Sequence, residues 1–232
     1  MIGPALLMLP GNMCDARLWH GLGDLGAAHA DLSHDDSIEN MAARALADHQ
    51  GALILIGFSM GGIVALEMAR GAPQRIKGLV LADTNAGADL PERAAARPIQ
   101  QARVRSGELA IIVADELKPA YLATQNQKNK PLKTLLFDMA MDLGEDVFVR
   151  QSEALRTRAD LGPVLKAFDG PVLFLCGAED ALCPPAWHQE MFARCRDAEL
   201  HVFEGAGHLL PLEQPIMFRA AIDGWLKRKF GE

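Results

Sequence analysis

The strongest constraint on the fold is a strand, a sharp turn and a helix that follow one another without a break. An apolar run ends at Ile56, the turn reads Gly57-Phe58-Ser59-Met60-Gly61, and a helical pattern continues to Arg70. Because glycine has no Cβ, the strand and the helix can pass closely and the residue between the glycines can take a strained backbone. We therefore expect the hydroxyl of Ser59 to project from the turn, above a helix N-terminus that favours negative charge.

Strand-like apolar runs alternate with helical patterns over most of the chain. The predicted strands are Ala5–Leu9, Ala52–Ile56, Ile76–Ala82, Pro171–Cys176 and Glu199–Phe203, and Asp31–Ser33 is a candidate for a further short one. The predicted helices are Met41–His49, Gly62–Arg70, Ala186–Arg194 and Ile216–Lys229, with Ser37 as the N-cap of the first. The pattern predicts an α/β fold with a mostly parallel sheet of about six strands, flanked by helices.

The alternation stops between about Ala86 and Leu161, where the sequence is helical throughout. Helices are predicted over Pro91–Arg105, Glu108–Leu122, Pro131–Leu143 and Glu145–Arg156. We expect residues 1–85 and 162–232 to form the α/β core and residues 86–161 to form a helical insertion.

Composition and charge argue against several classes of partner. The 232 residues are 50% hydrophobic and 23% charged, which fits one domain with an insertion. The net charge is −7, and no basic cluster occurs beyond Lys227-Arg228-Lys229, so nucleic-acid binding is not expected. Glycines interrupt the uncharged stretch 51–66, which indicates a buried strand and helix and no membrane partner.

The cysteines and glycines give no sign of a metal or a cofactor. The four cysteines include no Cys-x-x-Cys pair, so the sequence predicts free thiols and no metal site. No glycine pattern that cradles a phosphate or a dinucleotide is present, and we expect no cofactor. The apolar run 5–9 is too short for a signal peptide, and we expect a cytoplasmic protein.

The turn around Ser59 resembles the nucleophile elbow of the α/β-hydrolase superfamily, and the resemblance covers nearly the whole chain in motif order. The loop Gly177-Ala178-Glu179-Asp180 resembles the acid loop of that superfamily, and Glu204-Gly205-Ala206-Gly207-His208 resembles its histidine loop. The helical insertion falls where members typically carry a lid or cap. In two departures, the usual two N-terminal strands are missing and Pro10 replaces a histidine common before Gly11.

The resemblance implies a catalytic triad that lies beyond the carboxyl ends of the strands. Ser59 would be the nucleophile, His208 the general base, and Asp180 the acid that orients the histidine. Asp83, at the end of the run Ile76–Ala82, is the competing acid. Glu179 is expected to point away as a surface charge.

The resemblance also implies an oxyanion hole, in which two backbone N–H groups bind the oxygen that becomes negative during the reaction. One donor would be Met60, directly after the nucleophile. The other would be Asn12, in the loop after the first strand, with Met13 as a possible substitute. The alternative interpretation of this loop is a plain tight turn at Pro10-Gly11-Asn12.

These residues predict a serine hydrolase that cleaves a carboxylic ester, thioester or lactone with a mainly apolar acyl group through an acyl-enzyme intermediate. The alternatives are a carbon–carbon bond hydrolase or an acyltransferase on the same triad, or a non-catalytic ligand-binding protein on the same fold. In each case the partner would be a small molecule.

An apolar substrate pocket is expected between the triad and the insertion. Its candidate residues are Phe58, Tyr121, Leu135, Phe137, Met139 and Met141. The alternative is that these side chains only pack the helices of the insertion on one another. Charged substrates are expected to do poorly, since nothing near the motifs offers a fixed partner charge.

Overall fold

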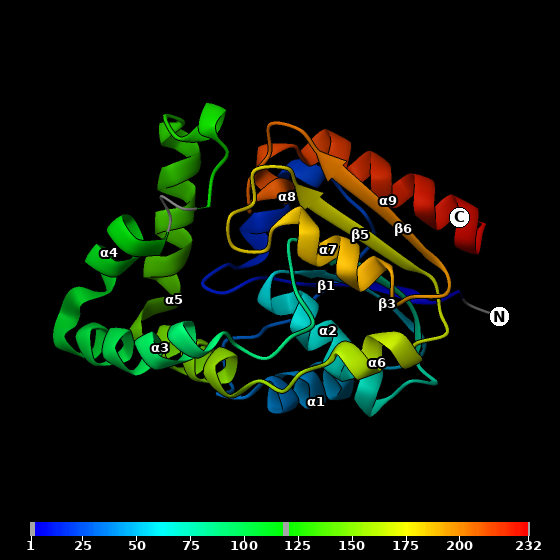
Figure 1. Cartoon of the computed structure of the whole chain (residues 1–232), viewed down its shortest axis with the longest axis horizontal. Coiled ribbons are helices and arrows are strands. Elements are labelled where there is room, and N and C mark those ends of the chain that lie inside the picture. Colours follow the sequence, from blue (N-terminus) through cyan, green and yellow to red (C-terminus); the bar gives the residue numbers. More distant parts are fainter. Residues whose placement is uncertain (1–2, 118–120, 232) are drawn as a thin grey trace.

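The computed structural model describes residues 3–117 and 121–231, and its centre is one six-stranded parallel sheet (Figure 1). The strand order is β2-β1-β3-β4-β5-β6, and every neighbouring pair is parallel. The strands are β1 (Ala5–Leu9), β2 (Ala28–His29), β3 (Leu53–Phe58), β4 (Ile76–Ala82), β5 (Val172–Gly177) and β6 (Ala198–Phe203). The α/β fold and the sheet of about six strands are therefore confirmed.

Side chains of the inner strands alternate between two hydrophobic cores, one on each face of the sheet. On one face, Leu55 and Leu81 pack with the helices α1 (Ile38–Asp48), α2 (Met60–Gly71), α6 (Gly162–Ala167) and α7 (Pro185–Phe192). On the other face, Ile56 and Val80 pack with the 3₁₀ helix η1 (Ala16–Leu22), α8 (Leu210–Glu213) and α9 (Pro215–Phe230). Strands buried on both faces explain why their sequences are continuous apolar runs.

The prediction of a short strand at Asp31–Ser33 was wrong. The strand lies earlier, at β2, where Ala28 and His29 pair with Leu7 and Met8 of β1. At Asp31 the chain turns, because its Oδ1 accepts the backbone N–H of Ser33 at 2.9 Å. The predicted N-cap is confirmed, since Ser37 Oγ accepts the N–H of Asn40 at the start of α1.

The insertion forms helices that stand beside the sheet, at the left of Figure 1. They are α3 (Pro91–Arg103), the π-helical η2 (Val104–Glu108), α4 (Leu109–Ile111), the π-helical η3 (Ile112–Leu117), the 3₁₀ helix η5 (Thr124–Asn126) and α5 (Lys130–Thr157). A third core, which includes Val104, Ile112 and Phe148, holds them together. The division of the chain at residues 86 and 161 stays a prediction.

Two glycines shape the insertion. Gly107 has φ +89° inside η2, where the chain kinks after α3. In place of the predicted helix Glu108–Leu122 the structure has the short pieces α4 and η3, and residues 118–120 of that prediction lie outside the described part. Gly144, with φ +81° and ψ 180°, interrupts α5 between the two helices predicted there. Within residues 3–117 and 121–231, no helix combines the length and apolar character that crossing a membrane requires.

Candidate active site

Ser59 occupies the tip of the turn between β3 and α2, with φ 51° and ψ −116°. This strained backbone is the one that the sequence predicts. A Cβ on Gly57 would collide with the backbone of α2, and one on Gly61 would collide with the carbonyl of Leu9 in β1. The glycines are therefore required by close packing, and Ser59 is held at the carboxyl end of the sheet.

His208 and Asp180 form a line of polar contacts that ends at Ser59. His208 Nε2 lies 3.0 Å from Ser59 Oγ, and His208 Nδ1 lies 2.8 Å from Asp180 Oδ2. The side chains of His208 and Asp180 are 5% and 0% exposed. The two residues are 28 positions apart along the chain and come from the loops after β6 and β5. The structure thus brings the three residues of the predicted triad together.

Asp180 is held as an anion by its surroundings. Burial by itself would raise its pKa, but His208 and the backbone N–H groups of Cys183 and Leu182 outweigh burial and hold the pKa below its usual range. The two N–H groups donate to Oδ1 at 2.9 and 2.8 Å, which leaves Oδ2 for His208. This arrangement fixes the orientation of the imidazole ring. Glu179, beside Asp180, is exposed as expected and accepts hydrogen bonds from Thr124.

Asp83, the competing acid, lies at the end of β4 but contacts backbone and not the histidine side chain. Its Oδ1 accepts the N–H of Gly177 at 3.0 Å, and its Oδ2 accepts the N–H of Leu210 at 3.3 Å. Asp83 is fully buried, and burial together with the nearby charge of Asp180 raises its pKa well above the usual value. Asp83 therefore connects the end of β5, where the acid loop begins, to the segment that follows His208.

Glu213, in α8, holds the histidine loop from the other side, and sequence reasoning missed it. Its Oε1 accepts the N–H groups of Gly207 and Leu209 at 2.8 and 3.2 Å, and its Oε2 accepts the N–H of Ala123 at 2.8 Å. The N–H of His208 itself donates to the carbonyl of Tyr121 at 2.7 Å. The histidine loop is thus fixed on both sides by backbone hydrogen bonds.

The loop after β1 is anchored by Gln151 of α5, a second residue that sequence reasoning missed. Gln151 Oε1 accepts the backbone N–H of Met13 at 2.8 Å and the side-chain amide of Asn12 at 3.1 Å, while its Nε2 donates to the carbonyl of Leu32. Because the N–H of Met13 already donates to Gln151, Met13 is a poor candidate for the substitute oxyanion donor. Asn12 and Met60 line the same cavity as Ser59.

That cavity has a volume of about 310 Å³ and contains Ser59 and His208 in its wall. Of the six predicted pocket residues, only Tyr121 lines it. The prediction was wrong for Phe58, Leu135, Phe137, Met139 and Met141. Phe58, Leu135 and Met139 belong to the core on the sheet, while Phe137 and Met141 pack against the core of the insertion. Their apolar surface is used to hold the fold, which was the alternative interpretation.

The wall of this cavity is charged, contrary to the expectation that no partner charge would lie near the triad. Three guanidinium groups line it, those of Arg93 and Arg97 from α3 and of Arg158 from the end of α5. A spacing of four residues places Arg93 and Arg97 on one face of α3, and this was the signal in the sequence. No sequence pattern indicates that this face turns toward Ser59.

Asp180, Cys183 and His208 are the described residues whose ligand atoms lie close enough to hold a metal ion. Their chemistry argues for another use. Asp180 already binds His208 and two backbone N–H groups, and burial raises the pKa of the Cys183 thiol, which stays protonated. A protonated thiol is a poor metal ligand.

Comparisons with known proteins find similar sequences and similar structures. Residues 6–221 match the model of the alpha/beta hydrolase family. The pimeloyl-[acyl-carrier protein] methyl ester esterase of Cronobacter sakazakii is 28% identical over 236 residues, which cover 94% of this chain and 90% of that protein. A putative 2-succinyl-6-hydroxy-2,4-cyclohexadiene-1-carboxylate synthase of Bacillus subtilis is 28% identical over 191 residues, covering 74% of this chain and 65% of that protein. The structure of a thermophilic esterase from Thermogutta terrifontis, with malate bound, superposes with a TM-score of 0.88 at 28% identity, covering 97% of this chain and 90% of that one.

Proposed function

Since this chain belongs to the alpha/beta hydrolase family, we propose that it is a carboxylic ester hydrolase with Ser59 as nucleophile, His208 as general base and Asp180 as the acid that orients the base. The observation that carries the proposal is the pair of contacts at 3.0 Å and 2.8 Å that connects Ser59 Oγ to Asp180 through the ring of His208. Serine attacks an ester only when a base within hydrogen-bond distance takes its proton.

In the first half of the reaction, the Oγ of Ser59 attacks the ester carbonyl while its proton passes to Nε2 of His208. Asp180 accepts the Nδ1–H of His208 and stabilises the imidazolium that forms. The carbonyl oxygen becomes negative, and the backbone N–H groups of Asn12 and Met60 bind it. The bond to the leaving alcohol breaks, the alcohol takes the proton from His208, and the acyl group stays on Ser59.

In the second half, water replaces the alcohol. His208 takes a proton from the water, whose oxygen attacks the acyl carbon of the acyl-enzyme. The bond to Ser59 breaks, and the proton on His208 returns to Oγ. The products are the free acid and the alcohol, and no cofactor is needed for these steps.

The names of the relatives support ester chemistry. Two of the similar proteins are called esterases, and they share 28% identity with nearly the full length of this chain. We propose a small-molecule ester as the substrate. The four free thiols fit a reducing compartment such as the cytoplasm.

Hydrolysis of p-nitrophenyl acetate and butyrate tests the proposal. Ser59→Ala should lower kcat by on the order of 10⁵-fold or more, because the nucleophile is gone, while circular dichroism and the thermal midpoint stay near those of the wild type. Ser106→Ala, at an exposed serine of the insertion, is the matched control and should keep full activity. Substantial turnover by Ser59→Ala would contradict the proposal that Ser59 is the nucleophile.

A further inference from the structure

We propose that the ester substrate carries a carboxylate group, and that Arg93 binds it beside the reaction centre. This inference rests on the proposed function, since it names the class of ester that the same cavity accepts. It replaces the expectation of an apolar acyl group.

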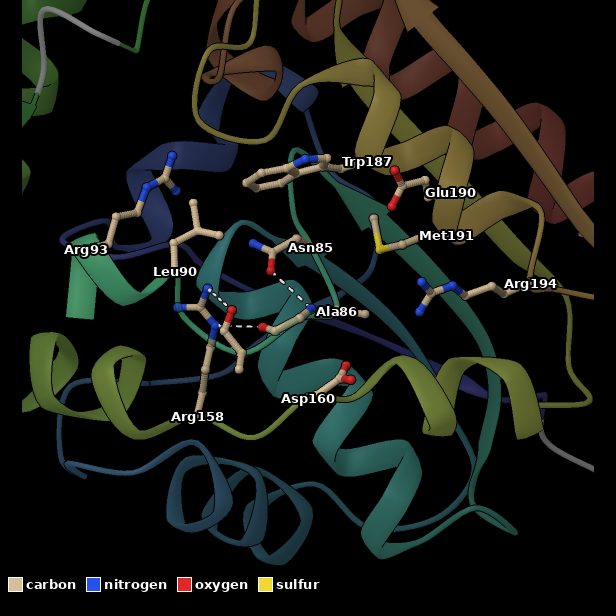
Figure 2. Close-up of a pocket in the computed structure, with 12 residues that line it drawn as sticks. Asn85, Ala86, Leu90, Arg93, Arg158, Asp160, Trp187, Glu190, Met191 and Arg194 are labelled. Atoms are coloured by element: carbon tan, nitrogen blue, oxygen red, sulfur yellow. Dashed lines mark hydrogen bonds between the residues drawn. The ribbon is translucent and has the colours of Figure 1, made fainter. Parts of the chain in front are cut away.

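Arg93 lies where two cavities meet. The reaction cavity contains Ser59 and His208, and a neighbouring cavity of about 370 Å³ is lined in part by Trp187 of α7. Asn85, Arg93 and Arg158 line both. Figure 2 shows the neighbouring cavity, with Arg93 at the left of the view, Trp187 to its right and Arg158 below. A substrate with its ester at Ser59 can therefore extend toward Arg93 without leaving the cavities.

The other two guanidinium groups of the reaction cavity are already neutralised in part. Asp89 bridges them: its Oδ2 lies 2.6 Å from Arg97 Nε, and its Oδ1 lies 2.9 Å from Arg158 Nη1. The side chains of Asp89 and Arg158 are 1% and 5% exposed. Arg158 also donates to the carbonyls of Gly87 and Leu155. This bridge forms a part of the wall in which both guanidinium groups already share the carboxylate of Asp89.

Arg93 differs from them, because no carboxylate of the described residues lies within ion-pairing distance of it. Its two terminal nitrogens each lie 3.4 Å from the carbonyl oxygen of Leu182, which is a weak contact. Its guanidinium carbon lies 5.9 Å from the centre of the Trp187 ring. Arg93 is half-buried, so its charge has neutral partners only and is partly removed from water.

The charge of the reaction cavity favours a monoanion. Three guanidinium groups (Arg93, Arg97, Arg158) and two carboxylates (Asp89, Glu116) line it, which gives 3 − 2 = +1. Glu116 does not serve Arg93, since it is bound to Arg103 and to Gln100. One carboxylate on the substrate would make the cavity neutral. The planar guanidinium group also matches a carboxylate with two parallel hydrogen bonds.

The test compares two methyl esters of almost equal size. Monomethyl glutarate carries a carboxylate, and methyl 4-carbamoylbutanoate carries a neutral amide in its place. We expect kcat/KM to be about tenfold or more higher for the carboxylate ester, and this ratio to fall with added salt because the charge on Arg93 is only half-buried. In Arg93→Gln, the ratio should fall about tenfold toward one. Arg105→Gln, at an exposed arginine of the insertion that lines neither cavity, should keep the wild-type ratio.

Calorimetric binding of the same two esters to Ser59→Ala and to the double variant Ser59→Ala/Arg93→Gln gives a second readout that needs no turnover. Preferential binding of the carboxylate ester that is lost on Arg93→Gln would support the inference even if the wild type cleaved neither ester. Absence of cleavage would count against ester hydrolysis alone. Equal kcat/KM for the two esters, or a preference that Arg93→Gln leaves unchanged, would overturn the inference. The proposed ester hydrolysis would stand in that case.

Discussion

At the scale of single residues, the site contains two buried aspartates with opposite environments. Asp180 faces the ring of His208 and two N–H groups, which hold its pKa low. Asp83 faces two backbone N–H groups without a cation, and burial and the charge of Asp180 raise its pKa. Asp180 is thus placed to orient the histidine, whereas Asp83 connects two loops.

This difference predicts unequal losses of activity. Asp180→Asn should lower kcat by on the order of 10⁴-fold, because an amide no longer holds the histidine in the tautomer that accepts the serine proton. Asp83→Asn should lower kcat less than tenfold, since it contacts only backbone. Steady-state kinetics of the two variants on the same ester measure both losses in kcat. A larger loss in Asp83→Asn would show that the acid comes from β4.

Asp83 should also give the stability of the protein a pH dependence. A carboxyl group whose pKa is raised in the folded state stabilises the fold fully below its unfolded pKa, about 3.9, and this contribution is lost as the pH rises through the folded pKa. Asp83→Asn should therefore lower the free energy of unfolding by less at pH 8 than at pH 5. Urea unfolding of the wild type and the variant at the two pH values measures this difference in stability. A destabilisation by Asp83→Asn that grows with pH would contradict the raised pKa of Asp83.

At the scale of elements, the main feature is the contact between the insertion and the loop after β1. Gln151 of α5 is 1% exposed and is the side chain that joins them through Asn12 and Met13. Met13 adds its side chain to the core of the insertion. Movement of the insertion would therefore move the proposed oxyanion donor at Asn12.

Gln151→Met should accordingly lower kcat by roughly 10- to 100-fold with little change in KM, because complete loss of one oxyanion donor costs about 10²–10³-fold. Gln101→Met is the matched control. Gln101 is also a buried glutamine of the insertion, but its side-chain amide donates to Ser152 and Glu153 and not to the loop after β1. If both variants lose stability and activity in parallel, Gln151 has a structural role only.

At the scale of the whole molecule, the features that the sequence predicts correctly are those that depend on a local sequence pattern. The strand Ile76–Ala82 was predicted with the bounds that the structure has, because its residues 78–82 are buried on both faces and form a continuous apolar run. The strain at Ser59 followed from its two flanking glycines. The sequence could group Ser59, Asp180 and His208 because each lies in the turn or loop after a strand, and the ends of parallel strands meet at one edge.

Features that depend on how the insertion packs were not predictable in this way. Phe137 and Met141 are apolar, and no local pattern separates side chains that fill a core from side chains that line a cavity. The same holds for Arg93 and Gln151, which read as ordinary polar residues of helices. Their roles depend on which face of α3 or α5 is turned toward the sheet. Only the three-dimensional packing determines this orientation.

The central claim, that Ser59 is the nucleophile of a serine hydrolase, is tested most directly by reaction with a fluorophosphonate. Intact-mass measurement followed by peptide mapping shows how many groups attach and where. We expect one adduct per chain, located on Ser59, loss of ester turnover in proportion to labelling, and no adduct on Ser59→Ala. An adduct on another residue, or undiminished turnover by fully labelled protein, would contradict it.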